Sequence, residues 1–141
     1  MFKIIYYYLL FYLAIVFHEL IHALFAKLFN FNIQKISLGT NFLKININIF
    51  SISPIIGNSY VEVDYSKIII AKRSEIIIFY LVPTVTSIII VFCFCFHLNN
   101  NYIKYTTIFL CLNIIYNLIP LSNTDLNMCM RILRKQKNIK M

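Results

Sequence analysis

Three long apolar runs dominate the sequence and predict helices long enough to cross a lipid bilayer. The runs extend over residues 4–29, 76–98 and 102–119. A spanning helix needs about 20 mostly apolar residues, and a somewhat longer run fits a tilted helix. No small-residue cleavage site follows the first run, so we expect it to be a helix and not a signal peptide.

A different pattern separates the first two runs, over residues 31–65. Polar and apolar residues alternate at 44–49 and again at 61–65, which is the period of a β-strand. The two glycines of the chain, Gly39 and Gly57, fall where turns would return one strand to the next. Because unpaired strand edges cannot face lipid, we expect this segment at the membrane interface or against the helices.

These patterns predict an all-α polytopic membrane protein with about three transmembrane helices and a small membrane-associated β segment between the first and second. We expect a single domain over residues 1–141 that ends in a basic, amphipathic tail over 126–141. The composition agrees, because 60% of the residues are hydrophobic, 13% are charged and the mean hydropathy is +0.77. A soluble domain carries about a quarter charged residues, so a soluble globule does not fit.

The formal net charge of +8 indicates orientation in the membrane, since Lys and Arg collect in cytoplasmic loops. With three spans, Lys3 and Lys104 fall on one face of the membrane. All other basic residues fall on the opposite face: Lys27, Lys35, Lys44, Lys67, Lys72, Arg73, Arg131, Arg134, Lys135, Lys137 and Lys140. We predict an integral protein of a bacterial cell membrane, with the N-terminus outside and the C-terminus in the cytoplasm. Its basic tail is expected to contact anionic lipid and not nucleic acid.

The first apolar run contains the sequence His18-Glu19-Leu20-Ile21-His22. On a helix, residues four apart project from one face, so the two imidazoles can bind one zinc ion. Glu19 lies next to both and can take a proton from water as a general base. The alternative is a chance pair of polar histidines. Ionisable groups inside a span cost about 2.5 kcal/mol or more and usually mark a functional site, which favours the metal.

A third ligand has to come from another part of the chain, and Asp125 is the only acidic residue after Glu75. Asp125 follows the third apolar run in a polar segment. That segment alone would be read as an ordinary turn, with Asp125 solvated or capping the next helix. Together with the two histidines of the first run, it becomes a candidate metal ligand at the same face of the membrane.

The two segments together resemble the site-2 protease family of intramembrane zinc metalloproteases, which includes bacterial members that process a sporulation sigma factor. That family pairs H-E-x-x-H in one transmembrane helix with N-x-x-P-x-x-x-x-D-G after a later one. This chain has Asn117-x-x-Pro120-x-x-x-x-Asp125. The resemblance implies one Zn²⁺ per chain bound by His18, His22 and Asp125, with Glu19 as the catalytic acid and base and Asn117 near the site to position substrate. It also implies a core of three helices with a strand-forming segment between the first two.

Two segments depart from the family pattern. Leu126 replaces the glycine after the aspartate, and the family's G-P-x-x-N is Val82-Pro83-Thr84-Val85-Thr86, which keeps only the proline. An alternative function is therefore a catalytically impaired zinc-binding membrane subunit with a binding or regulatory role. A further alternative is a structural or transport accessory protein that binds no metal.

The function that the resemblance implies is hydrolysis of a peptide bond within or next to a transmembrane segment of a membrane-protein substrate. Such a segment has to unwind before its backbone reaches the metal. The strand-prone residues 45–49 could pair with the unwound stretch by strand addition. We also expect that a second copy of the chain or a partner membrane protein could complete the substrate groove.

Overall fold

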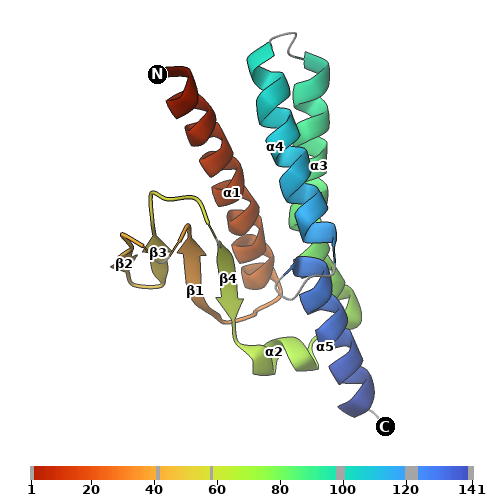
Figure 1. The fold of residues 1–141 in the computed structure, drawn as a ribbon. Coiled ribbons are helices and arrows are strands. Elements are labelled where there is room, and N and C mark those ends of the chain that lie inside the picture. The colour runs from red at the N-terminus through yellow and green to blue at the C-terminus, as the bar shows by residue number, and fades with distance from the viewer. Residues whose placement is uncertain (1, 41, 58, 98–100, 120–123, 140–141) are drawn as a thin grey trace.

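The computed structural model describes residues 2–40, 42–57, 59–97, 101–119 and 124–139. The described residues form five helices and one four-stranded sheet (Figure 1). In chain order these elements are α1 (Phe2–Leu28), β1 (Ile33–Leu38), β2 (Ile45–Ile47), β3 (Phe50–Ile52), β4 (Tyr60–Val63), α2 (Tyr65–Ile70), α3 (Arg73–His97), α4 (Asn101–Leu118) and α5 (Asp125–Ile139). Pro120, Lys140 and the end of the second predicted run at Leu98 lie outside the described residues.

The long helices α1, α3 and α4 run side by side, and α3 contacts both of the others and α5 (Figure 1). The sheet packs against the C-terminal half of α1, through β1 and β4. Tyrosine hydroxyls on α1 add hydrogen bonds to the loop after β3: Tyr12 donates to the carbonyl of Ser53 at 2.8 Å, and Tyr8 donates to that of Pro54. The sheet is therefore fixed directly to the helix that carries the H-E-x-x-H motif.

The sheet has the strand order β2-β3-β1-β4 and contains both parallel and antiparallel pairs. The central strand β1 pairs parallel with β3 and antiparallel with β4, while β2 and β3 form an antiparallel hairpin. Ile36 and Leu38 on β1 are buried. A tight turn after β1 places Gly39 at a φ of 83°, and an added Cβ there would collide with the carbonyl oxygens of Ile55 and Ser53, so this position requires glycine.

The predicted all-α fold is wrong, because the structure is mixed α/β. The segment expected to be a small β addition forms a four-stranded mixed sheet. The pattern at 44–49 and 61–65 predicted β2 and β4 but not the parallel partners β1 and β3. Parallel pairing joins residues far apart in the chain, and β1 carries a bulge between Ile33 and Lys35, which interrupts the alternation that a sequence pattern relies on.

The prediction of three transmembrane helices is also wrong. Within the described residues, only two helices are long and apolar enough to cross a membrane, at Phe11–Leu28 and Arg73–Phe92. The third run does form a helix, α4, which packs along α3. Its apolar character is diluted by three asparagines and a lysine: Asn101, Lys104, Asn113 and Asn117.

The basic segment after residue 124 is a packed helix and not a free tail. Cys129 and Ile132 of α5 lie in the main apolar cluster, whose other buried members are Ala26, Phe31, Ile68, Ile76, Phe79 and Tyr80. The buried side chain of Gln136 donates from Nε2 to the carbonyls of Ile69 at 2.8 Å and Ala71 at 2.7 Å. These bonds satisfy carbonyls at the end of α2, which a helix leaves without intrahelical partners. The helix α5 is thus held against α2 and α3 along its length.

If α5 is part of the core, Ile132→Ala should lower the free energy of unfolding by about 2–5 kcal/mol, the usual effect of removing a fully buried Ile side chain. The matched control is Ile139→Ala on the same helix, where the side chain is 64% exposed and the loss should stay below about 0.5 kcal/mol. Denaturant titration in detergent micelles, followed by circular dichroism, measures both. Equal losses for the two variants would show that α5 is not packed in this way.

Candidate metal centre

The helix α1 turns the H-E-x-x-H motif toward the interior of the protein. His18, Glu19 and His22 are 5%, 6% and 4% exposed. The neighbouring Leu20 and Leu24 are among the exposed large side chains on the opposite side of the helix. The two imidazole rings lie one helical turn apart with their centroids separated by 5.1 Å, as expected for residues four apart. The motif therefore presents two adjacent nitrogen donors to a buried space.

The first residue of α5 supplies an oxygen donor to the same place. Oδ2 of Asp125 lies 3.2 Å from Nε2 of His18 and 3.3 Å from Nε2 of His22. One donor atom from each of the three residues falls within 4.8 Å of the other two, so the group could hold a metal ion. We call these three residues the metal group. The same three residues are the metal ligands expected from the sequence, and the structure brings them together.

The position of Asp125 is fixed by the start of α5. Thr124 is buried, and its Oγ1 donates to the carbonyl of Ile119 at 2.7 Å, while its own carbonyl accepts from the N–H of Met128 at 3.0 Å. Leu126, which stands where the family pattern has glycine, lies in the first turn of the helix and not among the described residues with positive φ. An ordinary helical residue therefore suffices here to direct the carboxylate.

The two imidazole rings are held in different ways. Nδ1 of His18 lies 3.2 Å from Oγ of Ser87 on α3. The ring of His22 makes an edge contact with the ring of Phe79, with centroids 5.1 Å apart. Nδ1 of His22 is buried and has no hydrogen-bond partner in the described part of the chain. The sequence did not predict a role for Ser87, because its distance from His18 depends on how α3 packs against α1.

The electrostatics of the cluster favour a cation. Burial raises the pKa of Asp125, but hydrogen bonds from His18 and His22 outweigh that effect and hold the pKa below its usual range. Glu19 is buried close enough to Asp125 for the two carboxylates to repel each other. Nε2 of His18 and Nε2 of His22 both lie within ion-pair distance of Oδ2 of Asp125, at 3.2 and 3.3 Å. Since buried charges are expensive without a partner, a divalent cation would balance this group.

Asn117 lies in the last turn of α4 and is half-buried. No hydrogen bond between described residues joins its side chain to the metal group. Its place near the site thus remains a prediction.

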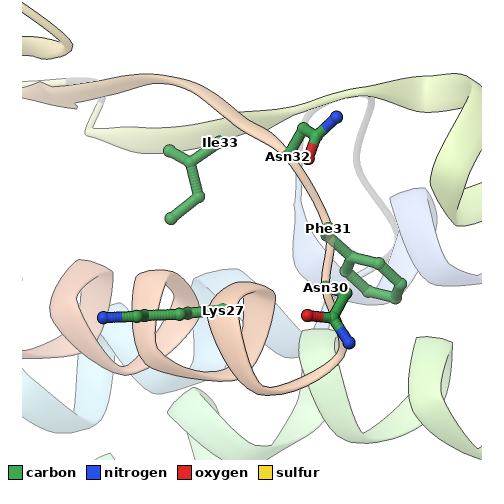
Figure 2. A pocket seen from close by; sticks show the side chains of 5 residues that line it. All are labelled: Lys27, Asn30, Phe31, Asn32 and Ile33. Atoms are coloured by element: carbon green, nitrogen blue, oxygen red, sulfur yellow. The ribbon is translucent and has the colours of Figure 1, made fainter.

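A separate pocket lies where α1 passes into β1, and Figure 2 shows the residues around it. In this view the side chain of Ile33 reaches from the strand toward the helix that carries Lys27. The other lining residues are Asn30, Phe31 and Asn32. None of these belongs to the metal group, so the candidate metal centre is not this pocket.

Comparison with protein-family models, with curated proteins and with solved structures finds no match to this chain. What can be said of the site therefore depends on its own geometry and on the two sequence segments that form it.

The geometry predicts one bound metal ion per chain, lost when a donor is removed. We expect His22→Ala and Asp125→Ala each to reduce the bound metal to below about one tenth of the wild-type content. The site has only three protein donors, and the two that remain would bind a metal ion much more weakly. The control is His97→Ala, at the far end of α3 from the site, which should leave the content unchanged. Elemental analysis of purified protein provides the measurement. Wild-type protein without metal, even after zinc is supplied, would contradict the site.

Proposed function

We propose that the chain is an intramembrane zinc metalloendopeptidase of the site-2 protease type. It hydrolyses a peptide bond within or next to a transmembrane segment of a membrane-protein substrate. The proposal is carried by one observation, the convergence of His18, His22 and Asp125 beside the buried Glu19. Imidazole and carboxylate are common zinc ligands, and three protein ligands with an open fourth position are typical of catalytic zinc sites. The resemblance of the two motifs to that family supports the same function.

Each group at the site has a distinct part in hydrolysis. Zinc held by His18, His22 and Asp125 would supply Lewis acidity to a peptide carbonyl and to a water molecule. The carboxylate of Glu19 accepts a proton from the attacking water and returns it to the leaving amine. The side-chain amide of Asn117 donates to the substrate backbone and orients it. The apolar helices around the metal group exclude bulk water, which strengthens the electrostatic interactions within the site.

The proposed location is a membrane crossed by the two apolar helices. The apolar window Phe11–Leu28 contains His18, Glu19 and His22, and the window Arg73–Phe92 contains Ser87, which lies beside His18. This supports a site within the membrane and not on its surface. The start of α1 lies at one end of the molecule, and α2 and the end of α5 lie at the other (Figure 1). The exposed basic residues of α2 and α5 therefore gather at that second end, which we assign to the cytoplasm.

Glu19 should be needed for catalysis but not for metal binding. We expect Glu19→Gln to lower cleavage of a model transmembrane substrate in liposomes by about 10²-fold or more, the usual contribution of a general base, while the zinc content stays at the wild-type level. The control, Glu62→Gln on β4, removes an exposed carboxylate and should cleave as the wild type does.

Other outcomes of this experiment separate the proposal from its rival. Cleavage that survives Glu19→Gln would show that Glu19 is not the base. Stoichiometric zinc in a wild-type protein that cleaves no membrane-protein substrate would support the catalytically impaired, regulatory subunit instead.

The free edge of the sheet offers a place for the unwound substrate. The strand β2 is at the edge of the sheet, with β3 on its other side, and its Ile45 and Ile47 are 64% and 57% exposed. Extended peptides bind such edges through backbone hydrogen bonds. We propose that the substrate adds to β2 as a further strand, which holds it extended at the edge of the sheet that lies away from α1 (Figure 1).

The register of the hairpin identifies the backbone groups that would bind substrate. Ile47 pairs with Phe50 across the two-residue turn, and Asn46 pairs with Ser51. Antiparallel pairs alternate between residues that exchange both hydrogen bonds and residues whose N–H and C=O groups point outward. Because the pair next to a two-residue turn is hydrogen-bonded, the outward groups of β2 belong to Asn46.

Removing the outward N–H of β2 should weaken this contact. We expect Asn46→Pro to lower cleavage by about fivefold, equivalent to about 1 kcal/mol for one backbone hydrogen bond, with the zinc content unchanged. Asn46→Ala lacks the same side chain but keeps the N–H, so it should cleave faster than the proline variant. Equal cleavage by the two variants would show that substrate does not add to this edge.

A further inference from the structure

Ser87 on α3 carries a partly buried hydroxyl that lies next to the metal group without belonging to it. Its Oγ lies 3.2 Å from Nδ1 of His18, on the side of the ring away from Asp125. The same Oγ donates to the carbonyl oxygen of Pro83 at 2.8 Å, one turn earlier on α3. The backbone carbonyl of Pro83, the hydroxyl of Ser87 and the imidazole of His18 thus form a chain of hydrogen bonds.

The direction of these hydrogen bonds follows from the chemistry of the groups. A carbonyl oxygen can only accept, so the single hydroxyl hydrogen of Ser87 goes to Pro83. The Ser87 oxygen can then only accept from His18, which places the ring hydrogen on Nδ1. In the absence of metal, Nε2 of His18 donates its own hydrogen to Asp125. When a cation replaces that hydrogen, the ring keeps its hydrogen on Nδ1 and the lone pair of Nε2 faces the metal group.

We propose that Ser87 is a positioning residue for the metal group, which fixes the orientation and tautomer of His18 so that Nε2 is free to bind zinc. This inference rests on the proposed metal site and adds to it a residue that does not touch the metal. Hydrogen bonds to the far nitrogen of a ligating histidine orient the ring and increase its basicity, and their loss typically weakens metal binding 10–100-fold. The asymmetry of the site strengthens the inference, because Nδ1 of His22 has no such partner among the described residues.

The neighbouring Thr86 provides a matched control. Its single hydroxyl hydrogen is shared between the carbonyl oxygens of Pro83 and Val82, each 2.9 Å from Oγ1. It makes no hydrogen bond to His18 within the part of the chain that the structure describes. Thr86→Ala therefore removes a side-chain bond to the same turn of α3 without changing the partner of the imidazole.

The test measures the affinity of the full-length purified chain for Zn²⁺ alone, by competition with a chromophoric chelator. We expect Ser87→Ala to raise the dissociation constant 10–100-fold. Thr86→Ala and Ser87→Thr, which retains the hydroxyl, should both stay within about threefold of the wild type. With Co²⁺ in place of Zn²⁺, the Ser87→Ala protein should reach the visible spectrum of the wild type at a higher metal concentration, because the ligand atoms are unchanged.

The outcomes distinguish this inference from the proposed function. Wild-type protein that binds neither metal would overturn the metal site itself. If the wild type binds and His18→Ala abolishes binding, an unchanged affinity in Ser87→Ala would overturn the role of Ser87 and leave the site intact. An equal loss in Thr86→Ala would also overturn it, because the effect would then belong to the helix.

A second measurement does not depend on whether the alanine variant folds. In zinc-loaded wild-type protein labelled with [¹⁵N]histidine, nitrogen NMR should show the hydrogen of His18 on Nδ1. A hydrogen found on neither ring nitrogen, or zinc bound through Nδ1, would overturn the proposal.

Discussion

A carboxylate at the start of α5 meets two imidazoles on α1, and the rest of the fold keeps these three groups together in an apolar interior. Polar groups of this kind lose hydration when they are buried, and that cost has to be offset by close partners. The partners come from elements far apart in the chain, so their distances depend on how the helices pack. Phe79, Ile76 and Ile132 supply this packing in the main apolar cluster, and the ring of Phe79 contacts that of His22. The large buried side chains thus fix the spacing of the donor atoms as well as stabilising the fold.

The parts of the candidate site that lie close together in the chain could be predicted from the sequence. The relation of His18 and His22 follows from helical periodicity alone, and their burial follows from their place in an apolar run. Asp125 could be selected because the chain contains so few carboxylates and because its spacing from Asn117 matches a known family. Ser87 could not be found in this way, since its contact with His18 is set by the rotation and depth of α3 against α1. Those quantities leave no periodic signal in the sequence.

In the sheet, too, some strands could be predicted from the sequence and others could not. Alternation of polar and apolar residues predicted β2 and β4, which are short and regular. It did not predict β1, whose bulge interrupts the alternation, nor the parallel pairing of β1 with β3. Apolar runs dominated the expectation of an all-α protein, because a long run is a stronger signal than several strands of three to six residues. The prediction for α4 was wrong because it relied on length. The helix is long enough to cross a membrane, but its three asparagines lower its mean hydropathy below that of a spanning helix.

The helix α5 also has a mechanical consequence. One end carries Asp125, and the other is tied through the amide of Gln136 to the last carbonyls of α2. Between these two points α5 is a continuous helix of about 16 Å, taking about 1.5 Å per residue, and a helix of this length transmits displacement with little bending. The position of the Asp125 carboxylate therefore depends on how α2 is packed, as well as on α1 and α3. The metal group and α2 are joined through one continuous helix.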